Sequence, residues 1–261
     1  MKTYDTKYAL IFLDTETTGI ESKDRLCQLA YKLPTDTYES MFDELYTPPL
    51  PIAIDAMAIH HITNKMIADK PAFTESSHFA DVKKLIQDPK SVTIAHNAPF
   101  DNGMLEKEGI IPTQFIDTLK IARHLDPEGK IPKYNMQYLR YFLELDNDIT
   151  VPIQAHDAKG DVIVLEHLFA RLLKSFMESK KLDTDGALTE MIRISLLPSL
   201  ILRINFGKHR GKLVTDVSKE DSGYLRWLYE QKLKSEEDET DWIFTLEKAM
   251  GIDKQPKLLA E

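Results

Sequence analysis

Apolar residues recur along the chain in two patterns, as short continuous runs and as longer stretches with helical spacing. Residues 8–14 form a compact apolar run that is typical of a buried strand, and residues 91–95 form a second one. The shorter, mixed segments 26–33 and 38–46 predict two strands that pair with the first as hairpins, and residues 115–116 predict a brief fifth strand. The first half of the chain is therefore expected to form a sheet.

Helical patterns alternate with these strands. We predict helices at residues 55–61, 74–87, 98–108, 135–145 and 157–174. The third of these has Asn97 in a capping position, Pro99 in its first turn and Gly109 at its end. Strands that alternate with helices in this way indicate an α/β sandwich.

The composition changes near residues 178–185, which are polar and charged. Beyond them we predict a strand at 201–206 and helices at 224–231 and 241–250. About 60 residues seldom form an independent core, so this part is expected to pack against the rest. The predicted organisation is a main domain at 1–178, a linker at 179–199 and a C-terminal module at 200–261.

Charge and cysteine content narrow the class of protein. The chain has 261 residues, 43% of them hydrophobic, and a formal net charge of −9. This charge counts against a protein that binds nucleic acid by electrostatics alone, unless some of the acids hold metal ions. Cys27 is the single cysteine, so no internal disulfide can form. Without a run of about 20 apolar residues, we predict a cytoplasmic protein that makes no contact with membranes.

Asp14 and Glu16 are the first candidates for chemistry. They lie two residues apart at the end of the first apolar strand, so both side chains are expected on one face of the sheet. Two carboxylates on one face can share hard divalent cations. Acid pairs arise easily in a chain with 42 acidic residues, so this pair alone leaves a structural explanation open.

Two later segments carry acids in comparable places. Asp101 falls in the first turn of a helix after a strand, where it either binds a ligand or complements the helix dipole. His96, at that strand's end, is interpreted as a core histidine. His156 lies in a loop and Asp161 follows in the first turns of a helix, which would place a mobile base beside a fixed ligand. The alternative is a surface histidine followed by a capping aspartate.

The order Asp-x-Glu, His-Asn-x-x-Phe-Asp, His-x-x-x-x-Asp resembles the DnaQ-like 3′→5′ exonucleases of the DEDDh type. His156 selects the histidine branch, since the tyrosine branch would have Tyr where Asp157 stands. The resemblance implies a ribonuclease H-like fold, a five-stranded mixed sheet flanked by helices, here with a small C-terminal α/β appendage. It also implies magnesium-dependent release of nucleoside 5′-monophosphates from DNA 3′ ends, in DNA repair or degradation.

Further blocks are similar to the exodeoxyribonuclease X group of this family. They are residues 56–63, 68–71, 198–200, 206–212 and 224–228. The Phe-Gly-Lys motif with its downstream Tyr-Leu-x-Trp-Leu is more specific than the carboxylates. The implied partner is DNA with a 3′ end, as a single strand or a duplex end, with protein partners unknown. An RNA-trimming 3′→5′ exoribonuclease, a polymerase-associated proofreading or scaffold subunit, and a binder without metal remain alternatives.

The resemblance implies a role for each motif residue. Asp14, Glu16 and Asp161 would hold one Mg²⁺ that activates water, and Asp14 with substrate oxygens would hold a second. Mn²⁺ is expected to substitute. Asp101 would act through metal-bound water, and His156 would be the general base. Six further residues would meet the terminal nucleotide: Thr17, Thr18, Gly19, His60, Asn97 and Phe100.

Residues 200–219 hold five Lys or Arg residues against one acid, in a chain that is acidic as a whole. We interpret them as a patch that contacts DNA phosphates through Lys208 and Arg210, rather than as a solvated turn. Three residues at helical spacing are interpreted as the core of the module rather than as a base-stacking platform: Tyr224, Trp227 and Leu228.

Overall fold

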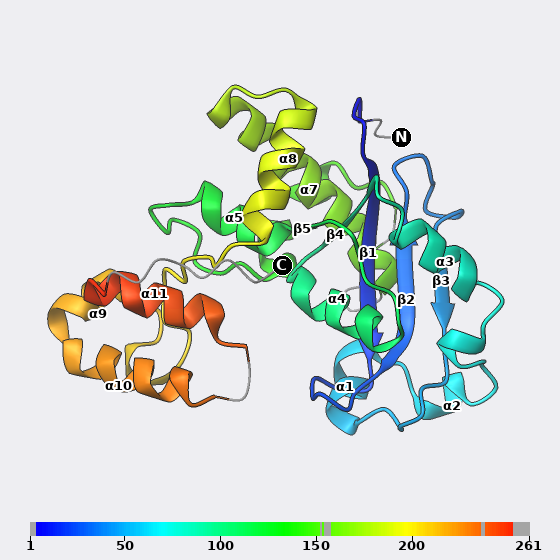
Figure 1. Ribbon diagram of the computed structural model, residues 1–261, viewed down its shortest axis with the longest axis horizontal. Coiled ribbons are helices and arrows are strands. Elements are labelled where there is room, and N and C mark those ends of the chain that lie inside the picture. The colour runs from blue at the N-terminus through cyan, green and yellow to red at the C-terminus, as the bar shows by residue number, and fades with distance from the viewer. Residues whose placement is uncertain (1–3, 152, 154–157, 236–237, 253–261) are drawn as a thin grey trace. The chain divides into compact units, whose positions relative to one another are not determined.

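The computed structural model describes residues 4–151, 153, 158–235 and 238–252. The chain divides into two compact units. The sheet unit is Met1–Leu119 with Asn135–Ile192, and the C-terminal unit is Lys120–Tyr134 with Arg193–Glu261. Each unit contains residues from two separate stretches of sequence (Figure 1).

The sheet unit is built on five strands in the order β3-β2-β1-β4-β5 (Figure 1). They are β1 (Ala9–Thr17), β2 (Leu26–Lys32), β3 (Phe42–Leu45), β4 (Ser91–Ala95) and β5 (Phe115–Asp117). β1 pairs antiparallel with β2 and parallel with β4; β2 and β3 are antiparallel, and β4 and β5 are parallel. The five predicted strands and the mixed sheet are confirmed.

Helices connect and follow the strands. They are α1 (Ile54–His60), α2 (Asn64–Ile67), α3 (Phe79–Ile86), α4 (Ala98–Lys107), α5 (Thr118–Leu125), α6 (Met136–Phe142), α7 (Ala158–Lys180) and α8 (Thr184–Ser195). The helix predicted at 74–87 is wrong in its first part. A 3₁₀ turn, η1 (Phe73–Glu75), ends at Ser76, which has extended backbone and whose hydroxyl donates to the Phe73 carbonyl. No described helix is long and apolar enough to cross a bilayer.

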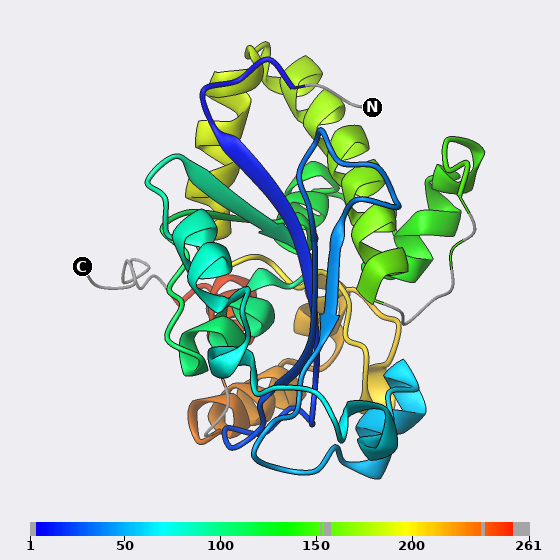
Figure 2. The ribbon, with the colours of Figure 1, turned by 90° about the vertical axis from the view of Figure 1, so that its right-hand side faces the viewer.

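Alternation along β1 determines which helix covers each face of the sheet. The Phe12 ring lies 5.4 Å from the ring of Phe169 on α7. Ile11 and Leu13 instead belong to the core that contains Val82 of α3. Even positions of β1 therefore face α7 and odd positions face α3 and α4, on the two sides of the strands in Figure 2.

The C-terminal unit is helical in its described residues. It contains α9 (Val214–Glu220), α10 (Ser222–Leu233), α11 (Thr240–Met250) and the 3₁₀ turn η3 (Gly207–His209). The strand predicted at 201–206 is wrong, and with it the α/β character of the appendage. Backbone bonds connect Leu202 and Ile204 with residues 211–214, but the pairing amounts to an isolated bridge between Arg203 and Leu213. The Ile201 amide donates to Thr245 Oγ1 on α11. The core of this unit is Ile204, Val214, Val217, Leu225, Leu228, Trp242 and Leu246.

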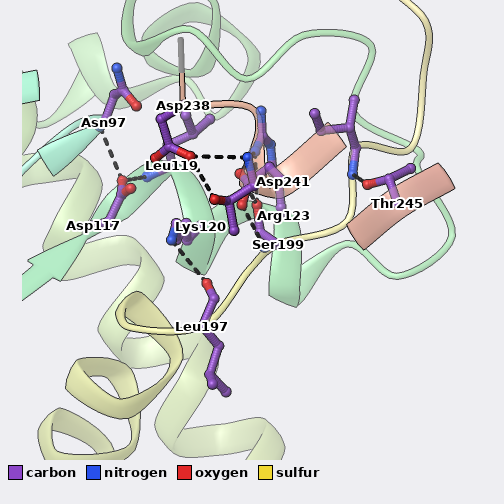
Figure 3. A network of polar contacts seen from close by, with 12 residues as sticks. Asn97, Asp117, Leu119, Lys120, Arg123, Leu197, Ser199, Asp238, Asp241 and Thr245 are labelled. Carbon is purple, nitrogen blue, oxygen red and sulfur yellow. Dashed lines mark hydrogen bonds and ion pairs between the residues drawn. The ribbon is translucent and has the colours of Figure 1, made fainter. Parts of the chain in front are cut away.

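Residues 120–134 join the C-terminal unit through polar contacts (Figure 3). Arg123 of α5 forms an ion pair with Asp241 of α11 at 2.9 Å, and Ser199 Oγ bonds both side chains. Lys120 Nζ donates to the Leu197 carbonyl at 2.9 Å. The predicted module boundary at residue 200 stays a prediction, and the predicted linker contains all of α8.

Candidate active site

Three carboxylates gather where β1 ends and α7 begins. Asp14 and Glu16 extend from even positions of β1, and the buried Asp161 lies in the first turn of α7. One ligand oxygen from each lies within 4.8 Å of the others. Like charges at this separation repel, and carboxylate oxygens are ligands that Mg²⁺ prefers. This three-acid cluster therefore fits a divalent cation, and it unites three of the four predicted metal ligands.

Gln137 on α6 fixes the orientation of Asp161. Its Nε2 donates to Asp161 Oδ1 at 2.6 Å. Arg140 Nη1 donates to Gln137 Oε1 at 3.4 Å, and Arg140 Nε is held by Asp146 at 2.6 Å. Because the guanidinium can only donate, this contact determines that the amide nitrogen points to Asp161. Sequence reasoning missed Gln137, since no local pattern shows that an amide reaches a carboxylate 24 residues later.

Asp101 is engaged with β1 and lies outside the three-acid cluster. Its Oδ1 accepts from the Thr15 amide at 3.0 Å and from Thr15 Oγ1 at 2.7 Å. The pairing of β1 with β4 ends at Phe12 and Ile94, so Asp101 takes an amide that β4 no longer reaches. Burial raises the pKa of Asp101 to about 7, the bonds from Thr15 oppose that rise, and the charge of Asp117 adds to it. Its predicted action through metal-bound water stays a prediction.

The turn that follows β1 is held by Asp24. Asp24 Oδ1 accepts from Thr18 Oγ1 and Oδ2 accepts from the Glu21 amide, each at 2.7 Å. Burial acts to raise the pKa of Asp24, but these bonds outweigh it and the pKa is lowered. A Cβ at Gly19 would lie 2.6 Å from Asp24 Oδ2, so position 19 has no space for a side chain. Thr17 Oγ1 donates to the Gly19 carbonyl at 2.7 Å.

His60 holds this turn from α1. Its Nδ1 accepts from the Ile62 amide at 3.0 Å, so the ring proton is on Nε2, which lies 3.1 Å from the Thr17 carbonyl. Burial lowers the pKa of His60, which favours the neutral ring. Both ring nitrogens therefore bond the backbone, and His60 positions Thr17.

Two predicted substrate residues flank the start of α4. Asn97 is exposed and Phe100 is half-buried. The prediction that the Asn97 side chain caps α4 is wrong, because Asn97 has a left-handed backbone (φ 72°) and makes no capping bond. The backbone amide of Asn97 donates to Asp117 Oδ1 at 3.0 Å, and Asp117 Oδ1 also accepts from the backbone amide of Leu119 (Figure 3). His96 Nδ1 lies 2.9 Å from Thr118 Oγ1, as expected for a histidine bonded within the fold.

His156 lies outside the described residues, so its role as base stays a prediction.

Comparison with known proteins decides the family. Residues 11–169 match the family model described as Exonuclease, and residues 204–232 match Exodeoxyribonuclease X-like C-terminal. The chain belongs to the exonuclease family. DEDDh exonucleases use a divalent metal, which the three-acid cluster of this chain fits.

Three similar proteins illustrate the relationship. The exonuclease is 34% identical over 223 residues to Exodeoxyribonuclease 10 of Escherichia coli K12, covering 84% of this chain and 90% of that protein. It is 31% identical over 202 residues to the DNA polymerase III subunit epsilon-like protein of Rhodobacter capsulatus, covering 72% of this chain and 27% of that protein. A solved structure of Exonuclease X in complex with 5′ overhanging duplex DNA matches with a TM-score of 0.53 at 25% identity, covering 71% of this chain and 99% of that one.

In the C-terminal unit of the exonuclease, the predicted phosphate contacts lie on η3 and the residue after it. Arg210 is exposed. Lys208 Nζ forms an ion pair with Asp221 Oδ2 at 2.6 Å, and His209 Nε2 lies 3.0 Å from the same oxygen. The bonds from Lys208 and His209 hold the pKa of Asp221 well below its usual range. Asp221 also caps α10 by accepting from the Tyr224 amide.

Proposed function

We propose that this chain is a magnesium-dependent 3′→5′ exonuclease that releases nucleoside 5′-monophosphates from the 3′ ends of DNA, for repair or degradation. The observation that carries this proposal is the three-acid cluster, which lies within the segment that matches the exonuclease family. DNA as the substrate is supported by the similarity to Exodeoxyribonuclease 10 and by the duplex DNA in the Exonuclease X structure.

Asp14, Glu16 and Asp161 would hold one Mg²⁺, and Asp14 would share a second with substrate oxygens; Mn²⁺ would replace either. Bound metal ions supply stabilisation of negative charge on phosphate oxygens and a more acidic water. Gln137 keeps Asp161 Oδ1 engaged, which limits the directions in which that carboxylate can present its other oxygen. Asp101 would act through metal-bound water.

His156 would take the proton of the attacking water. The backbone of Thr17, Thr18 and Gly19 would meet the terminal nucleotide, in a turn that Asp24 keeps in one shape. His60 would act by fixing the Thr17 carbonyl, while Asn97 and Phe100 would line the nucleotide site. Lys208 and Arg210 would contact phosphates.

A cytoplasmic location is part of the proposal. Burial, with the charge of Glu16 nearby, raises the pKa of the Cys27 thiol to about 12. A single buried thiol that stays protonated suits a reducing compartment.

The test uses 5′-labelled single-stranded DNA and RNA of one sequence. Each is incubated with the protein in Mg²⁺, with Mg²⁺ and excess chelator, and with the Asp14→Asn variant. A DNA ladder that shortens from the 3′ end and needs both the metal and Asp14 is the expected result. A ladder on RNA alone would favour an RNA-trimming enzyme. Without cleavage of either strand, the catalytic proposal falls and a scaffold role gains support.

A further inference from the structure

The C-terminal unit exposes an aromatic ring where the sequence predicted core. Trp227 on α10 is 52% exposed, whereas its neighbour Leu228 is 3% exposed. The second tryptophan, Trp242, is 9% exposed and belongs to the core of the unit. The core interpretation therefore holds for Leu228 and for Tyr224, which is half-buried and packs against the core, and is wrong for Trp227. A large indole surface in water is a feature of binding sites more than of structural positions.

Trp227 is part of an ordered group of rings. The Tyr224 ring lies one helical turn earlier, 5.6 Å from the Trp227 ring and tilted by 38°. Lys208 Nζ lies 5.1 Å from the centre of the Tyr224 ring, and the His209 ring meets that ring edge-on at 4.7 Å. We call Tyr224, Trp227 and Lys208 the aromatic platform.

Asp221 anchors Lys208 and the start of α10, and Gly207 leaves room for the Tyr224 hydroxyl. Asp221 binds Lys208 and His209 and accepts from the Tyr224 amide at 3.1 Å, so one carboxylate places both the cation and the first turn of α10. Gly207 has a left-handed backbone (φ 63°), and a Cβ there would lie 3.2 Å from the Tyr224 hydroxyl. The Phe-Gly-Lys motif and the Tyr-Leu-x-Trp-Leu motif are thus two halves of one surface. Groups that are already in place lose little entropy when they bind a ligand.

We propose that the aromatic platform binds single-stranded nucleic acid, with a base stacked on Trp227 and Tyr224 and an adjoining phosphate at Lys208. Aromatic rings stack any base, and cations beside them hold the backbone. The pair of Lys208 and Asp221 is solvent-accessible, with side-chain exposures of 62% and 31%, so the ammonium can exchange a carboxylate for a phosphate at small cost.

Charge favours nucleic acid over a peptide as the occupant. Residues 200–221 carry five Lys or Arg residues and three acids, a local excess of positive charge although the chain as a whole has a net charge of −9. Two of the acids, Glu220 and Asp221, form solvent-accessible ion pairs with Lys212 and Lys208. Arg226, immediately before Trp227, is also exposed. This inference rests on the proposed function, because the nuclease substrate is the nucleic acid expected at this surface. A second contact with the strand would lengthen its residence on the enzyme.

The experiment measures binding by the full chain carrying Asp14→Asn, in chelator, so that the strand stays intact. A fluorescein-labelled thymidine oligonucleotide and an abasic oligonucleotide of equal length are titrated by anisotropy. Trp227→Ala, Trp227→Phe and the control Tyr141→Ala, an aromatic residue of the sheet unit that is 62% exposed, are each made in this background. Thermal unfolding checks that each variant is folded.

Trp227→Ala should weaken binding of the thymidine strand roughly 5- to 150-fold, the range expected for loss of one stacked base. It should leave the abasic strand unaffected. Trp227→Phe should restore most of the affinity, and Tyr141→Ala should match the parent. Tryptophan fluorescence of the parent should be quenched by the thymidine strand, and this quenching should be lost in Trp227→Phe.

Equal thymidine affinity of Trp227→Ala and its parent would overturn the proposal, as would an equal loss on both strands. Hydrolysis of thymidine 5′-(p-nitrophenyl) phosphate by the wild-type chain separates this result from the proposed function. Hydrolysis without a Trp227 effect leaves the exonuclease and removes the platform. A Trp227 effect without metal-dependent hydrolysis keeps the platform and removes the exonuclease.

Discussion

The candidate active site and the C-terminal unit place their acidic side chains in contrasting surroundings. At the end of β1, the three-acid cluster brings like charges within 4.8 Å of one another. In the C-terminal unit, Asp221 meets Lys208 and Asp241 meets Arg123. The first arrangement becomes favourable when a divalent cation binds, and the second needs no added ion. Acid content alone does not distinguish a metal site from structural ion pairs, whereas the close grouping of the carboxylates does.

Asp14→Asn tests the first half of this contrast and should have the largest effect. Loss of a metal ligand removes several kcal/mol of charge stabilisation, so DNA cleavage should fall by about 10³-fold or more. Without metal, the thermal midpoint should stay the same or rise, because one repelling charge is gone. Gel assays and thermal unfolding with and without Mg²⁺ measure both.

The matched control for Asp14→Asn is Asp81→Asn, which changes an exposed acid on α3. It should leave cleavage and the Mg²⁺-induced rise in thermal midpoint unchanged. If Asp14→Asn kept near-wild-type cleavage, the three-acid cluster could not be the metal site.

His156→Ala separates proton transfer from metal binding. General-base assistance contributes about 10²–10⁴ in rate, so turnover should fall by that factor. The stabilisation of the protein by Mg²⁺ should persist, since the three-acid cluster is intact. Single-turnover assays at saturating Mg²⁺ provide the rate, and unchanged turnover would exclude His156 as the base.

Gln137→Met should show how far the cluster depends on the residues around it. Methionine has a similar length but no donor for Asp161 Oδ1. Removing an outer partner of a metal ligand costs about 10- to 100-fold in metal affinity or activity, so half-saturation should need more Mg²⁺ by that factor. Turnover at saturating Mg²⁺ should change less. Gln114→Met, whose amide binds the Pro89 carbonyl, is the control; an equal shift there would argue against a specific role for Gln137.

Asp221→Asn tests the structural ion pairs of the C-terminal unit. Its effect on stability should be the smallest of the four, because water screens the pair of Asp221 and Lys208. The folded-state pKa of Asp221 is depressed, so its contribution to stability is present above the pKa of an unfolded aspartate and is lost as the pH falls. Urea unfolding, followed by tryptophan fluorescence, should show a difference between wild type and variant at pH 7 that shrinks in acid. Asp216→Asn on α9 is the control, and a pH-independent difference would refute the role of the charge.

The sequence predicted the parts of the fold that depend on local pattern. The apolar runs and the shorter mixed segments located all five strands, and the alternation of side chains along β1 placed Asp14 and Glu16 on one face. Contacts between distant segments were not predictable in this way. The amide of Gln137 and the bond from Thr15 to Asp101 depend on how α6 and α4 pack.

In the C-terminal unit, too, local sequence pattern did not predict which contacts form between distant segments. The apolar run at 201–206 has strand composition, but its backbone bonds go to Thr245 on α11 and to residues 211–214, which form only an isolated bridge with it. Helical spacing correctly placed Leu228 in the core and could not show which side of α10 leaves Trp227 in water. Residue type and spacing therefore indicated the elements, while packing decided which side chains face a ligand.

The discontinuous make-up of the C-terminal unit has a consequence for biosynthesis and for gene fusion. Arg123 must wait for Asp241, 118 residues later, before its contact can form. Contacts of such large sequence separation form late and slowly. A ribosome would finish most of the sheet unit before residues 120–134 found their partners. A fragment that starts at residue 200 would also lack Arg123 and Lys120, so transplanting this segment onto another enzyme should require residues 120–134 to travel with it.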